Sequence, residues 1–228
     1  MLGKHLGGLV IGLLLASAAT AQQTPVDSSK HHVALTSAEV WAGYSPASTS
    51  AGVLGRHDGI RLGLIAMRLN WRVRESTKRS MYYTIDLIPV ARVSPLIEYQ
   101  TAYGTTIPSV FKCAPPERDC NRIEVPARGV GINPIGWTAV YGAGRTQWRF
   151  GATGGMLMFD RPAPSDLAAK FNFTAAIEGG LQLMSRGGHG VLLVYRLHHL
   201  SNAGTASDNL AMLSHVFSIG ATWRTGKR

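Results

Sequence analysis

Two neighbouring segments of this chain alternate between apolar and polar residues, and this alternation limits the fold more than any other feature. In TQWRFGATGGMLMF (Thr146–Phe159) and FNFTAAIEGGLQL (Phe171–Leu183), one parity is mostly apolar and the other mostly polar or small. Successive side chains of a β-strand point to opposite faces, whereas a helical face repeats every 3.6 residues. The two segments therefore predict adjacent strands, each with one apolar and one polar face.

Six further segments show the same tendency, most weakly in the first two. They are His32–Gly43, Ile60–Val73, Met81–Val93, Ile132–Gly142, His189–Ser201 and Leu213–Trp223. The sequence thus predicts eight strands, the minimum for a bacterial outer-membrane barrel. The predicted fold class is all-β, an eight-stranded antiparallel outer-membrane β-barrel.

The connections between the predicted strands alternate in length. Long ones and short ones take turns along the chain, at 44–59, 74–80, 94–131, 143–145, 161–170, 185–188 and 202–211. Outer-membrane barrels have this rhythm, because long external loops alternate with short periplasmic turns. A soluble lipocalin-like barrel is the competing interpretation, and it gives no reason for such a rhythm.

Ionisable residues indicate which parity of the strands faces lipid. Five of them fall on the polar parity of their strands: Asp86, Arg92, Arg149, Glu178 and Arg196. Charge is costly against hydrocarbon and tolerable in a hydrated lumen, so the predicted barrel is polar inside and apolar outside. The candidates for the interfacial aromatic girdles are Trp137, Tyr141, Trp148 and Trp223.

The N-terminus has the features of a secretory signal. Lys4 and His5 precede an apolar stretch from Leu6 to Leu15, and Ala19–Ala21 has the small-x-small pattern of a cleavage site. We predict a signal peptide over residues 1–21 and one mature domain over residues 22–228. A membrane anchor is the alternative, but glycines interrupt an apolar core shorter than the roughly 20 residues that span a bilayer.

Charge and cysteines point to the exported surface of a cell. The formal net charge is +10, but export argues against nucleic acid and favours anionic lipid as partner. Cys113 and Cys120 lie close together in a compartment that permits oxidation, so we expect a disulfide, with two free thiols as the alternative. No histidine pattern has ligand-like spacing, so we expect no metal.

The stretch VYRLHHLSNAG (Val194–Gly204) carries the residues of an esterase. His199 and Ser201 share the outward parity of their strand, at a Cβ separation of roughly 6–7 Å, so an imidazole can serve a serine nucleophile as general base. Asn202 and Gly204 follow, with an amide and backbone N–H groups suited to an oxyanion. A strand running into an ordinary turn is the alternative, since SNAG is also good turn chemistry.

This stretch closely resembles the signature of the lipid A 3-O-deacylase (PagL) family, in which His-x-Ser-Asn-Ala-Gly precedes a final strand. The resemblance implies an outer-membrane hydrolase without cofactor, whose site faces the outer leaflet and removes the ester-linked 3-position acyl chain of lipid A. It makes Ser201 the nucleophile, His199 the base, and Asn202 and Gly204 the oxyanion-hole residues. The implied partners are lipopolysaccharide, outer-membrane lipids and the barrel assembly machinery, which recognises final strands such as the one ending near Trp223.

One position departs from the family pattern. The best-known members complete a triad with a glutamate on the last strand, and the matching position here is Leu213. A Ser-His pair with an oxyanion hole retains part of the catalysis of a triad. Asp208 and His215 are the candidates for orienting His199. The competing function is a non-catalytic outer-membrane barrel, structural or lipid-binding, that has lost the acid.

External basic residues are candidates for the phosphates of lipid A, with ordinary solvated loop charge as the alternative for each. These residues are Arg56, Lys112, Arg118 and Arg161.

Overall fold

The computed structural model describes residues 35–49, 59–100, 106–107, 121–206 and 211–225. Eight long strands form one antiparallel sheet, and two short strands of two residues each join it. The long strands are β1 (Leu35–Ser45), β3 (Arg61–Glu75), β4 (Arg79–Gln100), β6 (Asn121–Tyr141), β7 (Thr146–Phe159), β8 (Phe171–Met184), β9 (His189–Ser201) and β10 (Met212–Arg224). The short ones are β2 (Ser48–Thr49), on β10, and β5 (Thr106–Ile107), on β4.

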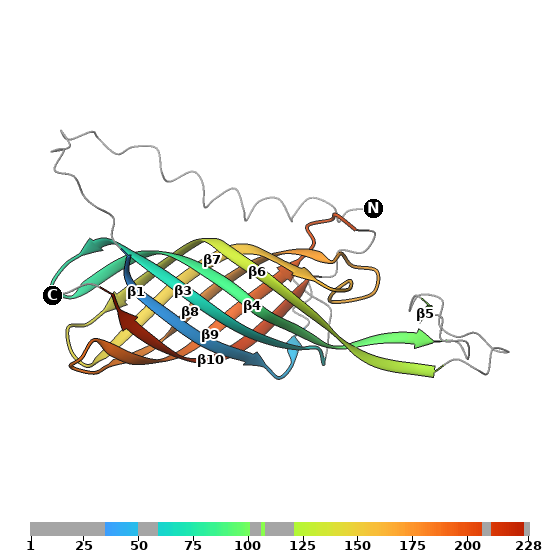
Figure 1. Cartoon of the computed structure of the whole chain (residues 1–228), viewed down its shortest axis with the longest axis horizontal. Coiled ribbons are helices and arrows are strands. Elements are labelled where there is room, and N and C mark those ends of the chain that lie inside the picture. The colour runs from blue at the N-terminus through green and yellow to red at the C-terminus, as the bar shows by residue number, and fades with distance from the viewer. Residues whose placement is uncertain (1–34, 50–58, 101–105, 108–120, 207–210, 226–228) are drawn as a thin grey trace, which may run out of the picture. The chain divides into compact units, whose positions relative to one another are not determined.

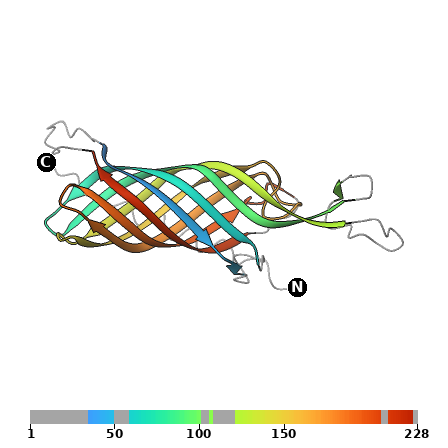
Figure 2. The same cartoon turned by 60° about the horizontal axis from the view of Figure 1, so that its bottom comes forward.

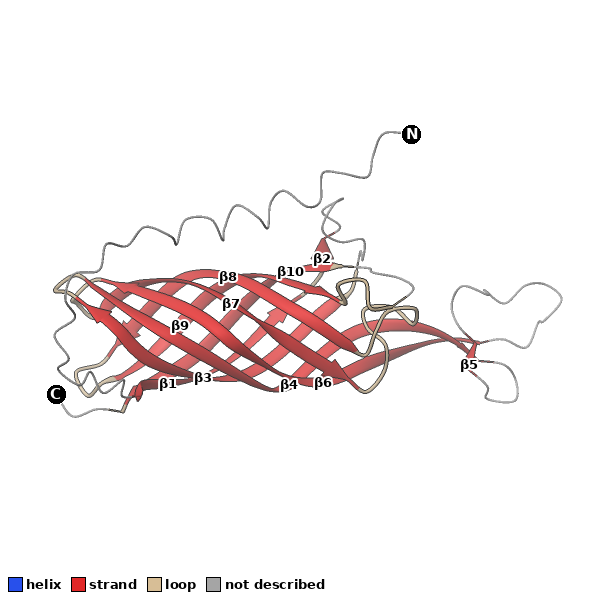
Figure 3. Cartoon of the chain, turned by 90° about the horizontal axis from the view of Figure 1, so that it is seen from above, coloured by secondary structure: helices blue, strands red, loops and turns tan. Residues whose placement is uncertain are grey.

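The sheet closes on itself. Each long strand pairs with the next one along the chain, and β1 pairs with β10 from Ser37↔Arg224 to Tyr44↔Phe217. The closure leaves no free edge among the long strands, so the predicted eight-stranded antiparallel barrel is confirmed. Figures 1 and 2 show the tilted strands wrapping around a common axis, and in Figure 3 the described residues are drawn as strands and loops. In the described residues no helix is long and apolar enough to cross a bilayer.

The two ends of the barrel differ in their connections. At one end, here called the turn end, the strands are joined by residues 76–78, 142–145 and 185–188, and both Leu35 and Arg224 lie there. The other end, the loop end, carries the longer connections and the last residue of β9. There β4 and β6 continue beyond the other strands as a long hairpin (Figure 1).

The long hairpin is the largest departure from the predicted strands. The expected connection over residues 94–131 is in good part strand, since β4 runs to Gln100 and β6 begins at Asn121. Its pairing shifts register at three places, between Tyr83 and Asp86, Ile88 and Ala91, and Val93 and Leu96. Each shift interrupts the period of two, so alternation alone does not reveal the continuous strands.

Most large apolar residues of the strands face outward. The exposed set includes the predicted girdle residues Trp137, Tyr141, Trp148 and Trp223, together with Ile65, Val130, Phe150, Ile177, Leu193, Phe217 and Ile219. An apolar outer wall on a closed barrel is the arrangement that a bilayer requires.

The middle of the lumen holds a buried network of charges. Arg68 donates to both Asp86 and Glu178, Arg149 bridges Glu39 and Glu178, and Arg196 donates to Glu178 at 2.8 Å. Glu178 therefore contacts three guanidinium groups. Arg196 also lies over the ring of Trp41, 3.7 Å from its centroid. Paired charges of this kind are what make burial of so many ionisable groups tolerable.

The expectation of a polar interior is corrected in part, and the inward placement of Arg92 is wrong. Toward the loop end the lumen is packed with apolar side chains, among them Leu62, Leu64, Ile88, Val93, Leu157, Leu200, Met212 and Val216. On β4, Ile88 and Pro89 stand opposite a single residue of β3, which is a β-bulge. Beyond the bulge the parity is reversed, so Ala91 and Val93 face inward and Arg92 is exposed.

Candidate active site

The two histidines of β9 point to opposite sides of the barrel wall. Arg196 and His198 are buried in the lumen, whereas Val191, Leu193 and Tyr195 are exposed on the outer face. His199 and Ser201 continue the outer parity at the loop end and are both partly exposed. The strand therefore presents an imidazole and a hydroxyl on the lipid-facing side, one pleat apart.

The turn after Ser201 is held by its own side chains. Ser201 Oγ accepts a hydrogen bond from the N–H of Ala203 at 3.1 Å, and Asn202 Oδ1 accepts one from the N–H of Gly204 at 2.9 Å. The Asn202 carbonyl accepts from both the N–H and the hydroxyl of Thr205. Ala203 and Gly204 have φ values of 52° and 81°, in the left-handed region. Glycine at 204 suits this conformation, whereas Ala203 adopts it against the preference of a residue with a Cβ.

The neighbouring strands supply an apolar surround. His199 stands between Ala175 of β8 and Leu213 of β10, and Ser201 stands opposite Phe173 of β8. Phe173 is exposed on the outer wall and packs edge-on against Phe171, with ring centroids 5.2 Å apart. The surface beside the serine is thus aromatic and aliphatic, as an acyl chain requires. Sequence reasoning missed this role of Phe173, although its outward parity was predicted.

The carboxylate position of the family pattern is occupied by Leu213, which lies directly across from His199. Nδ1 of His199 is buried and has no hydrogen-bond partner in the described residues. His215 lies one pleat away on β10 and bonds instead to the hydroxyl of Tyr195, at 2.6 Å from its Nδ1. The other candidate for orienting His199, Asp208, lies outside the described residues.

The proposed site residues lie close together, but hydrogen bonds do not join all of them in the described residues. Within the described residues no hydrogen bond joins His199 to Ser201, whose hydroxyl is engaged by Ala203. The N–H of Gly204 is likewise engaged by Asn202, which is buried. Hydrogen bonds of catalytic groups often tighten only with substrate bound, so this geometry leaves the assigned roles as predictions.

Several other predicted residues have different outcomes. Arg161 lies at the loop end with its Nε 3.8 Å from Asp160. The signal peptide, the cysteines Cys113 and Cys120, and Arg56, Lys112 and Arg118 lie outside the described residues, so the predictions for them stay predictions. No cluster of His, Cys, Asp or Glu with metal-binding geometry occurs in the described part of the chain.

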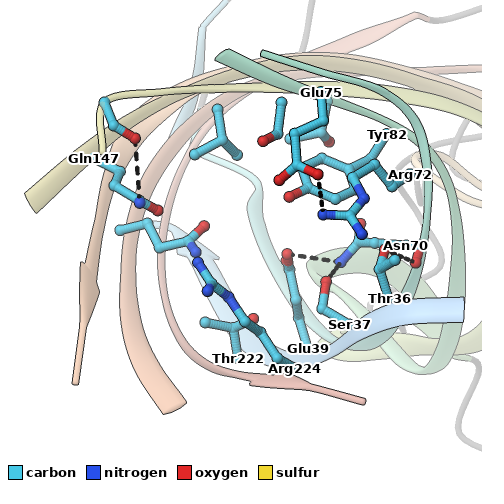
Figure 4. A pocket seen from close by; sticks show the side chains of 15 residues that line it. Thr36, Ser37, Glu39, Asn70, Arg72, Glu75, Tyr82, Gln147, Thr222 and Arg224 are labelled. Carbon is cyan, nitrogen blue, oxygen red and sulfur yellow. Dashed lines mark hydrogen bonds and ion pairs between the residues drawn. The ribbon is translucent and has the colours of Figure 1, made fainter. Parts of the chain in front are cut away.

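A polar cavity opens at the turn end of the lumen, far along the strands from Ser201. Ser37, Glu39 and Asn70 meet there in hydrogen bonds, and the exposed pair of Arg72 and Glu75 closes over them (Figure 4). No histidine or cysteine lines this cavity in the described residues, so the outer corner of β9 remains the candidate catalytic site.

The fold and the outer wall define the class of protein: a closed eight-stranded antiparallel barrel with an apolar exterior and an interior that is charge-paired in its middle and apolar toward the loop end. Within this class the chain is similar to the lipid A 3-O-deacylase (PagL) family, whose model matches residues 129–222. That region runs from the middle of β6 nearly to the end of β10 and contains the whole of the proposed site. The resemblance seen in the sequence is therefore confirmed.

One solved structure supports the fold, and two others show a weaker similarity. The crystal structure of the outer membrane enzyme PagL is 13% identical, with a TM-score of 0.50 over 81% of this chain and 98% of that chain. Two further matches are Neisserial surface protein A (12% identity, 82% and 96% covered, TM-score 0.43) and outer membrane protein OprG from Pseudomonas aeruginosa (9%, 85% and 97%, 0.39). No curated protein matches this chain significantly in sequence.

Proposed function

We propose that the protein is an outer-membrane esterase that removes the 3-O-linked acyl chain of lipid A through Ser201 and His199. One observation carries the proposal: a serine and a histidine share the lipid-facing side of β9, next to apolar Phe173, Ala175 and Leu213. An ester whose acyl chain lies in the membrane reaches such a site from the side. The match of residues 129–222 to the lipid A 3-O-deacylase family supports the substrate class.

The proposed reaction proceeds in two half-reactions. Ser201 Oγ attacks the ester carbonyl while His199 accepts the hydroxyl proton, and the carbonyl electrons move onto the oxygen. Collapse of this intermediate breaks the bond to the sugar oxygen, which takes the proton from His199. Water then hydrolyses the acyl-serine in the same way and releases the fatty acid. No metal or cofactor is required.

The oxyanion of the proposed intermediate needs hydrogen-bond donors near Ser201. Asn202 and Gly204 are the proposed donors, and a modest rotation of the SNAG turn would redirect the Gly204 N–H from Asn202 Oδ1 toward the substrate. A single donor of this kind is worth about 10²–10³ in kcat. The proposed substrate requires the loop end of the barrel to face the outer leaflet. The end of β10 near Trp223 is the proposed binding segment for the assembly machinery.

The leucine at the acid position of the family pattern favours a second candidate function. Leu213 stands across from His199, and within the described residues no group accepts from Nδ1 to orient the base as in a triad. A barrel that kept the strand and turn of the family but lost catalysis would have this arrangement. It would bind lipid A or serve a structural role without cleaving it.

A mass spectrum of lipid A distinguishes the two candidates. The wild-type chain and Ser201→Ala are expressed in a Gram-negative host whose lipid A keeps its 3-position ester. We expect the wild type to yield lipid A that lacks one hydroxyacyl mass, and Ser201→Ala to yield none. Identical spectra from two barrels that are both folded in the outer membrane would establish the non-catalytic alternative.

A further inference from the structure

Three arginines lie side by side on the outer wall of the barrel. Arg92 of β4 and Arg128 of β6 are directly paired across the two strands, and Arg61 of β3 lies diagonally next to Arg92. All three are exposed. They lie on the loop-end part of their strands, since Arg61 opens β3 and Arg92 follows the bulge of β4.

The three guanidinium groups have no ion pair with any residue in the described part of the chain. Asp160, just after the end of β7, accepts a hydrogen bond from the backbone N–H of Arg128 at 2.9 Å, and its carboxylate lies 3.8 Å from Nε of Arg161. Glu124 lines the same hollow as Arg61 and Arg92 and is not a free carboxylate. Like charges directly opposite each other on a sheet are destabilising, so this cluster calls for an anion from outside the chain.

The wall beneath the arginines is hollowed and apolar. A groove runs along β4, β6 and β7 past Pro89, Val90, Val130 and Met158, and Arg92 and Arg128 lie at its loop end. The groove continues toward the turn end past Leu87, Ile132 and Met156. The β-bulge that turns Arg92 outward also places Pro89 in this groove.

A second hollow lies beside Arg92. Tyr44, Arg61, Arg92 and Ser94 surround it, and Gly63 forms its floor as the cross-strand partner of Arg92. A Cβ added at Gly63 would meet no atom within 4 Å. The cluster thus has space for a headgroup next to its charges and an apolar channel below them, which is the shape of an amphiphile.

We propose that this wall binds a phosphate-bearing lipid of the surrounding leaflet, with its phosphate on Arg61, Arg92 and Arg128 and an acyl chain in the groove past Val130 and Met158. Arginine is suited to phosphate because its planar donors bind two oxygens at once. Counted around the barrel, three long strands lie between β4 and β9 in either direction, so this is not the site of Ser201. The proposal goes beyond the esterase function and does not depend on it.

Binding of a defined lipid tests the proposal in a background without catalysis. Purified Ser201→Ala barrels are mixed in detergent with bis-phosphorylated lipid A, or with the same lipid A lacking both phosphates, and bound lipid is counted by native mass spectrometry. The test variant adds Arg61→Gln, Arg92→Gln and Arg128→Gln. A matched control removes the same charge from exposed arginines at the turn end, through Arg74→Gln, Arg145→Gln and Arg186→Gln.

We expect the phosphorylated lipid to bind at least tenfold more tightly than the dephosphorylated one, and the test variant to lose this preference. The matched control keeps the preference. Gly63→Leu retains every charge but fills the hollow beside Arg92, so it also weakens binding. Shifted gel mobility on heating confirms that each barrel is folded.

Three results would overturn the proposal. Equal binding of the two lipids removes the role of the phosphate, and equal loss in the matched control reduces the effect to net charge. Displacement of the lipid by millimolar inorganic phosphate would make the cluster a site for free anions instead. None of these results bears on Ser201, so the esterase proposal stands or fails separately in the lipid A spectrum.

Discussion

Replacing Leu213 by glutamate is the sharpest test of how the candidate site works. Leu213 is the cross-strand neighbour of His199 and is nearly buried, with 9% of its surface exposed. Nδ1 of His199 is buried and lacks a partner in the described residues. A carboxylate at this position would accept a hydrogen bond from Nδ1–H and stabilise the imidazolium that forms when Ser201 loses its proton.

The size of the effect follows from that single bond. A hydrogen bond to a charged group is worth about 1.5–3 kcal/mol, and about 1.4 kcal/mol corresponds to tenfold. Because the imidazolium exists only during the reaction, Leu213→Glu should raise kcat/KM about 10- to 100-fold, mostly through kcat. The same carboxylate loses hydration at a nearly buried position, so we expect a loss of about 1–3 kcal/mol in stability.

The assay follows release of the hydroxyacyl chain from lipid A in detergent micelles. Leu213→Gln is the matched control, because glutamine has a similar shape without the charge and should stay within a few-fold of wild type. Ser201→Ala combined with Leu213→Glu should be inactive. If folded Leu213→Glu is no faster than Leu213→Gln, then the missing acid does not limit this site and the reasoning from Nδ1 is wrong.

Two further predictions concern the barrel itself. Glu178→Gln leaves Arg68, Arg149 and Arg196 without their shared carboxylate, so it should lower the free energy of unfolding by about 3–5 kcal/mol. Glu75→Gln, in the exposed pair with Arg72, should lower it by under about 1 kcal/mol. Urea titration of the folded barrel in detergent measures both. Gly180→Ala puts a Cβ 2.2 Å from the Leu193 carbonyl oxygen and should lower the free energy of unfolding by about 1–3 kcal/mol. The Cβ of Gly154→Ala meets only the Thr174 oxygen, at 3.8 Å, so this variant should be nearly neutral in the same titration. Equal losses in the two variants would show that the close backbone contact between β8 and β9 does not matter.

The sequence was most informative where strands are regular. β7 and β9 run over the predicted ranges, Thr146–Phe159 and His189–Ser201, because nothing interrupts their alternation. The same parity predicted that His199 faces outward and that Leu213 lies across from it, and the register agrees. Parity with pairing order is enough to predict a barrel wall, since each face of a strand has only one environment.

Alternation failed where the backbone departs from a period of two. The bulge at Ile88–Pro89 reversed the orientation of Arg92, and the register shifts of β4 and β6 hid the long hairpin. The charge network was invisible for another reason. Glu178 meets Arg68 across 110 positions of sequence, and only the closed geometry of the barrel brings such residues together. Whether His199 and Ser201 share a hydrogen bond depends on side-chain rotation, which neither pattern nor parity determines.

The bulge of β4 shifts the phase of the inward and outward alternation along this strand. Thr84, Asp86 and Ile88 face the lumen on even numbers, whereas Ala91 and Val93 do so on odd numbers. Removing one residue between Ile88 and Ala91 would make the bulge unnecessary and leave Arg92 outward, whereas the present sequence paired without a bulge would direct Arg92 into the apolar interior near Leu62 and turn Val93 toward lipid. A point substitution changes one side chain, but pairing the same residues without the bulge would exchange the surroundings of those that follow it. The number of residues between Ile88 and Ala91 therefore affects the fold of β4 as specifically as the identity of any residue in it.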